Sequence, residues 1–472
     1  MTVAVLPRWR VFPALGLGVL MATLDISVVN IALPTLSRAF QVPLTTVEWV
    51  VLAYVLAITG LLLTLGRWAD AAGRRRVYGW GLALFTVASA LCAAAPTAPL
   101  LITARAVQGL GAAMMTANST ALLTANFPPE ERGRALGAFG AMVGVGLALG
   151  PPLGGLVIGH LSWRWIFLIN IPIGLLARWL LHARVPADPP RRASPDLNLG
   201  GAALWCAGLV SLMLALSLGP AHGWGDVHVW PAFAAAAVLL AAFAVTEVRA
   251  AQPLLPVGLL LGPLGIAATL TLIGNALSIS IGFQLPLYLE EVLHFDAGKS
   301  GQWLAVMPLT ALFVTPIAGR WSDRLGARPL SVTGLLLTAA GFAVLSQVGV
   351  APHPGHIMGG MALIGAGLGL FTAPNSSAVM GAVPADQLGL ASGLQATMRN
   401  LGIAGGAAAM AAIVSSRFVA HGGGLLGANP EGGATHPLEF ALATRDAYLV
   451  MAAVAVAAAA LAFRQPVRVK VG

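Results

Sequence analysis

The stretch Gly66-Arg67-Trp68-Ala69-Asp70-Ala71-Ala72-Gly73-Arg74-Arg75-Arg76 has a second copy about half the chain later, Gly319-Arg320-Trp321-Ser322-Asp323-Arg324-Leu325-Gly326-Ala327-Arg328. Gly, Arg, Trp, Asp and a second Gly recur at identical spacing, and each copy lies between two long apolar runs. A two-fold repeat in an apolar chain is typical of transporters built from two homologous helix bundles. The repeat therefore predicts two similar halves, each with a short basic loop, that move against each other around a site at their interface.

The composition excludes a water-soluble protein. The chain of 472 residues is 58% hydrophobic and 9% charged, with a mean hydropathy of +0.84, whereas soluble globular proteins carry roughly 25% charged residues. The formal net charge of +9 is of the sign that nucleic-acid-binding domains carry, but the arginines stand singly or in short clusters between apolar runs. We therefore expect a chain that faces lipid over most of its surface and binds no nucleic acid.

Fourteen runs of about 18 or more apolar residues are long enough to cross a bilayer as helices. They form a first group of six, a central pair and a second group of six, near residues 11–34, 47–66, 77–95, 99–122, 134–158 and 163–182, then 199–219 and 229–248, then 262–289, 300–320, 329–349, 356–382, 389–416 and 446–464. This pattern predicts an all-α membrane protein of two six-helix bundles plus two extra central helices. The expected domains are the N-terminal bundle at 1–185, a linker with the two additional helices at 186–255, and the C-terminal bundle at 256–472.

The distribution of Lys and Arg predicts how the chain crosses the membrane. With the N-terminus inside, 19 basic residues lie on the inner side and 5 on the outer side, while Arg105 and Arg399 lie within spans. Because positive residues are enriched in cytoplasmic loops, both termini are expected in the cytoplasm. An even number of spans requires the same.

Two charged residues of the first bundle are the strongest candidates for a coupling site. Asp25 lies in the first span and Arg105 in the fourth, and a charge at that depth costs roughly 2.5–3.5 kcal/mol on insertion scales unless it faces a cavity or a partner. Arg105 cannot lose its proton and needs a carboxylate or several carbonyl groups, so Asp25 is the obvious candidate partner. Protonation of Asp25 would weaken such a pair, which makes it a candidate proton-driven switch; a structural ion pair is the alternative.

Small residues recur along the fifth span at four-residue spacing, interrupted by two prolines: Gly146, Gly150, Pro151, Pro152, Gly154 and Gly155. Small residues at this spacing let helices approach closely, whereas the prolines favour a kink. The stripe is interpreted as a packing face or as a moving hinge.

Five polar residues within spans are candidates for lining a substrate cavity: Asn30, Gln108, Asn275, Gln284 and Arg399. For Asn275 and Gln284, hydrogen bonds between helices explain the residue equally well. For Arg399, structural pairing and gating are alternatives of equal weight.

No motif for an enzyme or a cofactor emerges. Gly298-Lys299-Ser300 resembles the end of a phosphate-binding loop, but Leu293 stands where that motif requires its first glycine. The nine histidines show no zinc spacing, and the two cysteines have no partner spacing for a metal or a disulfide framework. Without a nucleophile–base set, we expect no metal, no cofactor and no enzymatic activity.

Four motifs, in order, resemble the fourteen-span drug:proton antiporter family of the major facilitator superfamily. These are the first-span segment from Leu24 to Pro34, the loop from Gly66 to Arg76, the segment from Arg105 to Gly111 and the segment from Gly146 to Gly155. With the six-two-six arrangement of spans, the resemblance covers nearly the whole chain and implies the major facilitator fold.

The resemblance also implies roles for individual residues. In the family, the loop aspartate, here Asp70, docks near the cytoplasmic end of a helix in the other half and stabilises the outward-facing state, which suits the positive end of a helix. The implied gating residues are Gly66, Asp70, Gly73, Arg74, Asp323 and Arg324. The second loop lacks an arginine directly after its second glycine, so its gate is expected to be weaker. The fifth-span stripe would pack against the second half and limit leak, and Asp25 and Arg105 are associated with proton coupling.

Together these patterns predict a proton-driven exporter of a small, lipophilic or cationic molecule, working by alternating access in the cytoplasmic membrane of a bacterium. Its expected partners are the substrate, protons and the lipid bilayer, with a periplasmic adaptor in a Gram-negative host and a monomeric state otherwise. A dedicated exporter of one host-made metabolite or antibiotic, and a lipid flippase, are the alternatives. A membrane receptor is disfavoured, because a receptor does not need duplicated gates.

Overall fold

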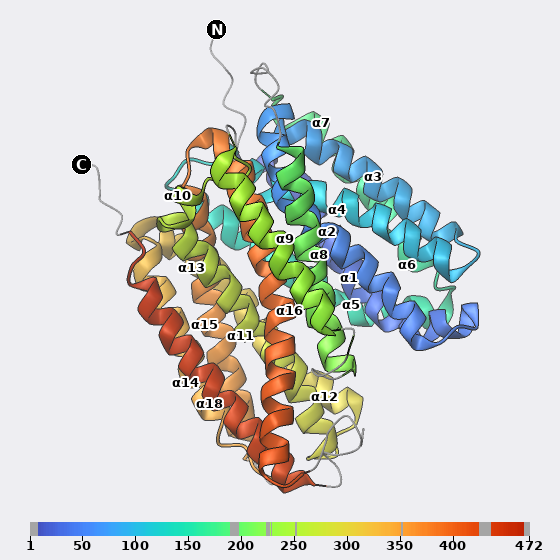
Figure 1. Cartoon of the computed structure of the whole chain (residues 1–472), viewed down its shortest axis with the longest axis vertical. Helices are drawn as coiled ribbons and strands as arrows, with labels where there is room; N and C mark the ends of the chain where they lie inside the picture. Colours follow the sequence, from blue (N-terminus) through green and yellow to red (C-terminus); the bar gives the residue numbers. More distant parts are fainter. Residues whose placement is uncertain are drawn as a thin grey trace. The chain divides into compact units, whose positions relative to one another are not determined.

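The structure is a computed structural model that describes residues 8–188, 198–222, 227, 229–250, 253–350, 353–423 and 436–466 (Figure 1). Across these residues the regular structure is helical and contains no strand. Fourteen of the helical stretches are long and apolar enough to cross a membrane. This confirms the predicted all-α class and the predicted number of spans.

The helices of the first group are α1 (Phe12–Phe40), α2 (Leu44–Ala72), α3 (Arg74–Ala94), α4 (Ala98–Asn126), α5 (Arg132–His160), and the short α6 (Trp165–Leu168) followed by α7 (Asn170–Arg184). The central pair consists of α8 (Leu199–His222) and α9 (Val229–Arg249). After the short α10 (Val257–Leu260) come α11 (Pro263–Glu291), α12 (Ala297–Leu304), α13 (Val306–Leu325), α14 (Ala327–Leu345), α15 (Pro354–Gly381), α16 (Leu388–Ala420) and α18 (Pro437–Ala462).

The repeated basic segment is helical rather than a loop, contrary to expectation. In the first copy α2 continues to Ala72 and α3 begins at Arg74, so that Gly73 alone separates the two helices. In the second copy Gly326 separates α13 from α14 in the same way. Both glycines have positive φ, 104° and 83°, a conformation that side chains with a Cβ rarely adopt. Each recurring second glycine therefore ends one helix and directly starts the next.

Three expected spans differ clearly from the prediction. The sixth is broken at Ile169 between α6 and α7, and the tenth is broken at Ala305 between α12 and α13. The last begins at Pro437, nine residues before the predicted start at 446. Proline is favoured in the first turn of a helix because its missing N–H has no partner there anyway. The polar pair Arg445 and Asp446 belongs to the helix rather than to the loop before it.

The chain divides into two compact units, each described here on its own. The first comprises residues 1–210, 239–257 and 380–397, and the second comprises residues 211–238, 258–379 and 398–472. In the first unit α4 packs against α2 and α3, and α5 packs against α1; in the second unit α18 packs against α14 and α11. The first unit thus contains the start of α16, and the three-part division expected from the sequence stays a prediction.

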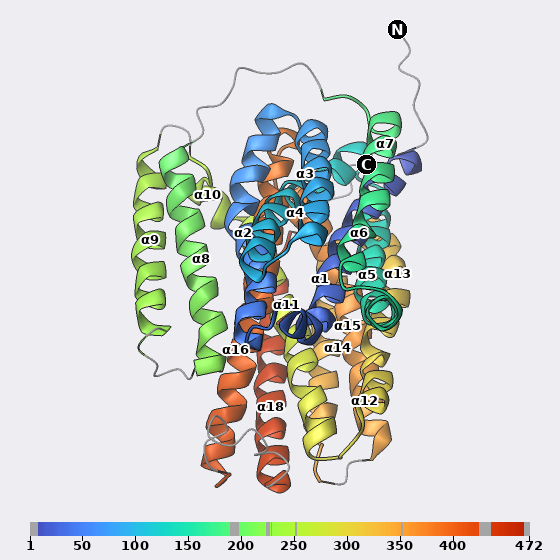
Figure 2. The same cartoon turned by 90° about the vertical axis from the view of Figure 1, so that its right-hand side faces the viewer.

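The central pair forms a hairpin of neighbouring helices, visible in Figure 2. Within the first unit, the ring of Trp205 on α8 lies 4.9 Å from that of Phe243 on α9. Gly208 packs so closely on Leu240 that a Cβ there would lie 2.8 Å from the leucine side chain. Aromatic and glycine contacts of this kind hold the two helices together.

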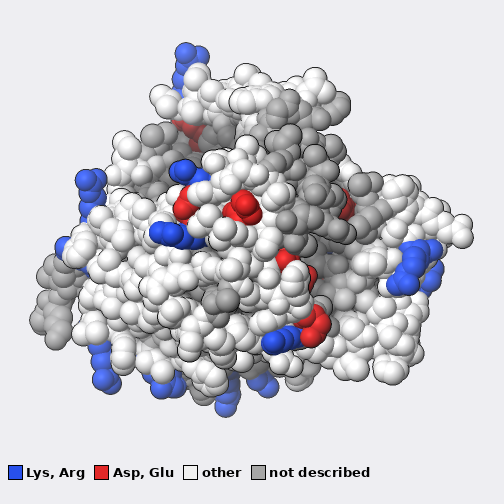
Figure 3. Space-filling model, turned by 90° about the horizontal axis from the view of Figure 1, so that it is seen from below, with Lys and Arg blue, Asp and Glu red and all other residues white. Residues whose placement is uncertain are grey.

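Helix faces that point outward are apolar. On α3 the side chains of Tyr78, Leu82 and Phe85 are buried, while Trp80, Val87 and Leu91 are 42–59% exposed. In the face drawn in Figure 3, charged side chains are scattered over a surface that is mainly uncharged. Exposed apolar stripes of this size are stable against lipid rather than water.

Candidate functional site

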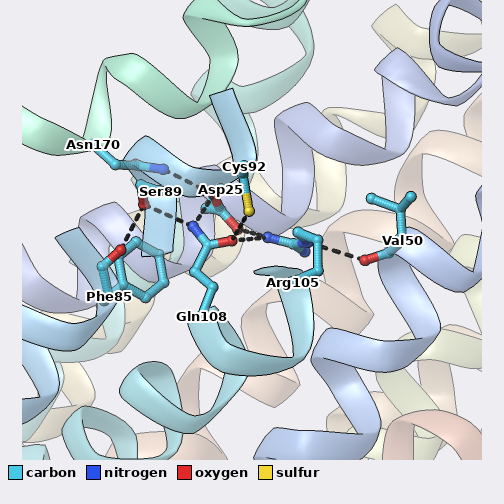
Figure 4. Close-up of polar contacts among 8 residues, drawn as sticks. All are labelled: Asp25, Val50, Phe85, Ser89, Cys92, Arg105, Gln108 and Asn170. Carbon is cyan, nitrogen blue, oxygen red and sulfur yellow. Dashed lines mark hydrogen bonds and ion pairs between the residues drawn. The ribbon is translucent and has the colours of Figure 1, made fainter. Parts of the chain in front are cut away.

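Asp25 and Arg105 meet inside the first unit, although they are 80 residues apart in the sequence (Figure 4). Asp25 lies on α1 and Arg105 on α4. Arg105 Nη1 donates to Asp25 Oδ2 at 2.5 Å, and neither side chain has exposed surface. The ion pair suggested by the sequence is therefore present and fully buried.

Two amides and a hydroxyl complete a hydrogen-bonded network around this pair (Figure 4). Asn170 Nδ2, at the start of α7, donates to Asp25 Oδ1 at 2.8 Å, and Gln108 Nε2 donates to the same oxygen at 3.1 Å. Gln108 Oε1 accepts from Arg105 Nη1 at 2.6 Å, and Gln108 Nε2 also donates to Ser89 Oγ at 2.8 Å. Gln108 was expected at a substrate cavity; the structure places it in this network, without exposed surface.

The network is built for the charged form of Asp25. The two carboxylate oxygens accept three N–H donors, one from Arg105 and two from neutral amides, and an N–H group of these types cannot accept a hydrogen bond in return. A protonated Asp25 would lose the Coulomb attraction to Arg105 and would turn an O–H group toward a donor. Binding of a proton therefore requires the network to rearrange.

Arg105 is held from a third helix, α2. Its Nε donates to the carbonyl oxygen of Val50 at 3.0 Å, and its guanidinium lies 4.0 Å from the ring centroid of Tyr54. Helices α2 and α4 approach this closely because residue 109 is glycine: a Cβ there would lie 2.7 Å from the carbonyl oxygen of Tyr54. The glycine that follows Arg105 by one turn thus positions the arginine.

Three polar atoms of this site have no hydrogen-bond partner among the described residues: Arg105 Nη2, Asn170 Oδ1 and the hydroxyl of Tyr54. All three are buried, and a buried polar atom without a partner is costly. Together they offer donors and an acceptor beside a buried carboxylate, which is what a transferred proton or a water molecule would need.

Asp70 connects α2 to the first turn of α16 within the first unit. Its two oxygens accept hydrogen bonds from the backbone N–H groups of Gly389, at 2.8 Å, and Leu390, at 2.9 Å. Arg74 donates from Nε to Asp70 Oδ1 at 2.8 Å and from Nη2 to the carbonyl oxygen of Ala385 at 2.7 Å. A carboxylate at this point satisfies the unpaired N–H groups of the helix and opposes the positive end of its dipole.

Gly66 makes this contact possible. A Cβ at residue 66 would collide with the carbonyl oxygen of Gly389, and residue 389 in turn has a carboxylate oxygen of Asp70 2.6 Å from where its own Cβ would be. Two facing glycines therefore let the backbones of α2 and α16 meet directly.

A second aspartate, not identified from the sequence, anchors the other end of the same segment. Asp188, after α7, accepts hydrogen bonds from the backbone N–H groups of Arg75 at 2.9 Å and Arg76 at 3.0 Å. It therefore binds the N-terminus of α3 as Asp70 binds that of α16. Arg178 supports this arrangement by donating to the carbonyl oxygen of Gly79 at 2.5 Å.

The second copy of the repeat is placed near the end of α13. Asp323 is partly buried and Arg324 is exposed. Arg328, in α14, lies with its guanidinium 5.5 Å from the ring of Phe463. The weaker second gate stays a prediction.

The glycine stripe of α5 faces α1 in the same unit. A Cβ at Gly146 would collide with Thr23, one at Gly150 with Ser27, and one at Gly154 would lie 3.2 Å from Val28. Nothing lies within 4 Å of the Cβ position at Gly155. The helix continues through Pro151 and Pro152 to His160. Packing is thus observed for part of the stripe, and its contact with the second half stays a prediction.

The other candidate cavity residues lie in different surroundings. Asn30 is exposed on α1. Gln284 is fully buried and donates to Thr444 Oγ1 at 2.7 Å, and the half-buried Asn275 donates to the carbonyl oxygen of Thr271 at 2.8 Å. Arg399 is half-buried on α16. Asn30 belongs to the first unit, as Asp25 does, whereas Asn275, Gln284 and Arg399 belong to the second unit.

Asn170 and Ser89 are the site residues that the sequence did not reveal. Asn170 stands in the apolar run Ile169-Asn170-Ile171-Pro172, and a lone amide in a span is a signal of the same kind that drew attention to Asn275. Ser89 gives no such signal, because a serine in a span satisfies its hydroxyl on its own helix, as Ser89 does by donating to the carbonyl oxygen of Phe85 at 2.8 Å.

Comparison with known proteins identifies relatives over most of the chain. The family described as Major Facilitator Superfamily matches residues 15–285 and 264–471. The riboflavin transporter RibZ of Clostridioides difficile (strain 630) is 31% identical over 413 residues, which cover 85% of this chain and 87% of that protein. The multidrug resistance protein Stp of Mycobacterium tuberculosis (strain CDC 1551 / Oshkosh) is 33% identical over 410 residues, which cover 85% of this chain and 75% of that protein.

A solved structure confirms the expected fold. The proton:xylose symporter XylE, bound to 6-bromo-6-deoxy-D-glucose, superposes with a TM-score of 0.67 at 15% sequence identity, covering 98% of this chain and 96% of that chain. At this identity the likeness shows the fold alone. The predicted major facilitator fold is thus confirmed.

Proposed function

Because this chain belongs to the Major Facilitator Superfamily, we propose that it exports small lipophilic molecules in exchange for protons. It is a multi-pass membrane transporter with a relative named for multidrug resistance. The outward direction of transport, the exchange with protons and the residues that couple proton movement to export are proposed in addition.

The buried pair of Asp25 and Arg105 carries the proposal. A carboxylate that accepts only N–H donors in a site without exposed surface changes its interactions with two other helices, α4 and α7, when it binds a proton. Arg105 keeps its charge throughout. Binding of one proton therefore leaves Arg105 without its counter-charge. This change is large enough to shift the equilibrium between two conformations of the transporter.

The proposed cycle has two steps, proton binding from the outside and proton release to the inside. A proton from outside binds Asp25, Arg105 and Gln108 rearrange, and the substrate leaves on the outer side. Release of the proton inward restores the three N–H hydrogen bonds to Asp25 seen here. The hydrogen bonds of Asp70 to Gly389 and Leu390 support a role as a latch that closes and opens once in each cycle.

The site of action proposed is the cytoplasmic membrane of a bacterium, with both termini in the cytoplasm. The distribution of basic residues supports this orientation. The chain would act as a monomer, or with a periplasmic adaptor in a Gram-negative host. No catalytic reaction is proposed, and no group of three or more metal-binding side chains occurs in the described ranges.

A dedicated exporter of one metabolite is the second candidate. The 31% identity to a protein named for riboflavin transport favours it, because that relative is named for a single compound rather than for many drugs. The two candidates share the coupling site and differ in how many compounds are transported.

Efflux from energised everted vesicles tests the coupling. Ethidium transport would be compared between the wild type, Asp25→Asn and the control Glu48→Gln, which removes an exposed carboxylate of α2, each with and without a proton uncoupler. Loss with Asp25→Asn and with the uncoupler, but not with Glu48→Gln, supports the proposal. Transport that survives both treatments overturns proton coupling at Asp25. If the wild type does not move ethidium, the same variants would be tested with riboflavin and a metabolite panel.

A further inference from the structure

The two arginines within the predicted spans, Arg105 and Arg399, differ in their contacts. Arg105 has an ion pair, a carbonyl oxygen, an amide oxygen and an aromatic ring around it. Arg399 makes no hydrogen bond, ion pair or ring contact with any residue that the structure describes. Both carry a charge that cannot be lost by deprotonation, so the guanidinium of Arg399 lacks a counter-charge among the described residues.

Arg399 lies well inside its span. It is the twelfth residue of α16, a helix of 33 residues, and at 1.5 Å per residue it lies about 17 Å from the first one. The hydrocarbon core is about 30 Å thick, so a helix of this length places Arg399 within the core rather than at the lipid headgroups.

Among the described residues of the second unit, no carboxylate contacts Arg399. Most of the acidic residues there are near helix ends: Glu290 and Glu291 on α11, Asp296 before α12, Asp323 on α13 and Glu439 on α18. Asp446 lies further inside α18, as its tenth residue. Asp446 pairs with His421 at 3.1 Å. His421 is 22 residues after Arg399, which corresponds to about 33 Å along the helix axis at 1.5 Å per residue. Among the described residues of its unit, the positive charge of Arg399 therefore has no compensating carboxylate.

A polar residue of α11, Asn275, packs beside the turn of α16 that follows Arg399. Gly402, one turn further along the same face of α16, packs on α11, where a Cβ would lie 3.1 Å from the Cβ of Asn275. Arg399 and Asn275 are each half-buried rather than buried. Charged side chains within membrane spans face the interior of the helix bundle or a water-filled cavity rather than lipid.

We infer that Arg399 binds an acidic group of the exported molecule, a carboxylate, phenolate or sulfonate, while its apolar part lies among the helices. This inference rests on the proposed export function and names its substrate class. The guanidinium offers paired N–H donors that match such anions. Asp25, by contrast, has its charge matched by Arg105 and both oxygens engaged, so it offers no free site for a cation.

Two dyes with the same xanthene frame and opposite charge separate the possibilities. Fluorescein is anionic and rhodamine 123 is cationic, and binding of each to the purified full chain in detergent would be followed by fluorescence anisotropy. The variants are Arg399→Gln, Arg399→Lys and the control Arg249→Gln, which neutralises an exposed arginine at the end of α9. Each would be checked for an unchanged thermal midpoint.

We expect the wild type to bind fluorescein more tightly than rhodamine 123. Arg399→Gln should weaken fluorescein binding about tenfold, because losing a hydrogen bond between charged groups lowers the affinity by about this factor. Arg399→Lys should weaken the binding less, and Arg249→Gln should not change it. Absence of fluorescein binding, a preference for rhodamine 123, or no effect of Arg399→Gln overturns the inference.

Competition experiments distinguish the substrate from other anions, and the binding assay distinguishes failure of the anion site from failure of proton coupling. Competition by phosphatidylglycerol but not by phosphatidylcholine would assign Arg399 to a lipid headgroup, and competition by inorganic phosphate alone would assign it to a small anion; both outcomes overturn a substrate role. Because binding is measured without a proton gradient, proton coupling at Asp25 can fail in the efflux assay while the anion site at Arg399 stands, and the reverse.

Discussion

Asp70 on α2 and Gly389 on α16 are 319 residues apart in the sequence, yet Asp70 Oδ1 accepts a hydrogen bond of 2.8 Å from the backbone N–H of Gly389. The other oxygen accepts from Leu390 N at 2.9 Å. One carboxylate therefore satisfies two of the unpaired N–H groups at the start of a helix from the second half of the chain.

Replacement of Asp70 should loosen the start of α16. Asp70→Ala removes both acceptors, and loss of a helix cap costs about 1 kcal/mol. We expect faster hydrogen exchange at the amides of Gly389 and Leu390, measured by mass spectrometry on the purified protein. Asp70→Asn keeps one acceptor oxygen and should have a smaller effect. Unchanged exchange in Asp70→Ala would show that the contact is not maintained in the membrane protein as isolated.

Removing one charge of the buried ion pair should destabilise the protein more than removing both charges. Asp25→Asn leaves Arg105 charged and buried without a counter-charge, and breaking a buried pair from one side costs about 3–5 kcal/mol. We expect a clear drop in the thermal unfolding midpoint. The double variant Asp25→Asn/Arg105→Gln removes both charges and should recover most of the loss. A double variant no more stable than Asp25→Asn would contradict the assignment of the loss to the uncompensated arginine.

Two glycines of α5 should respond in opposite directions to the same substitution. Gly150→Ala would push a Cβ into Ser27 of α1, and overpacking of this kind costs about 1–3 kcal/mol. Gly155→Ala meets nothing within 4 Å and should be neutral or stabilising, because alanine favours a helix over glycine by about 1 kcal/mol. Thermal unfolding of the two variants checks this, and equal effects would mean that the stripe does not pack on α1.

Asp188 is expected to stabilise the start of α3. Asp188→Ala frees the backbone N–H groups of Arg75 and Arg76, with an expected loss of about 1 kcal/mol. Faster hydrogen exchange at these two amides is the measurement, and Asp188→Asn, with one acceptor left, serves as the matched control. If exchange rises only at α16 and not at α3, the cap assigned to Asp188 is wrong.

Some of the candidate site followed from single residues. A carboxylate and an arginine are each so unfavourable within a membrane that their presence in separate spans predicts a partner, and Asp25 and Arg105 are indeed paired. The amides behave otherwise. Gln108 and Gln284 looked alike in the sequence, but Gln108 bonds with the ion pair and Gln284 with Thr444, because a neutral side chain takes whichever partner the packing of helices brings near.

The sequence by itself determined the class of protein, the number of spans and the repeat. These properties are local, because an apolar run of sufficient length is stable in a membrane whatever its neighbours are, and a repeat is visible in the recurring residues. The structure added that Gly73 and Gly326, both with positive φ, each separate two helices.

Only the tertiary structure decided which polar groups meet. It placed Asn170 on Asp25, Asp188 on α3 and Asp70 on α16, and it left Arg399 without a partner among the described residues. The physical reason is that hydrogen bonds and ion pairs act over a few ångströms. Their members are therefore chosen by how helices pack and not by any spacing along the chain.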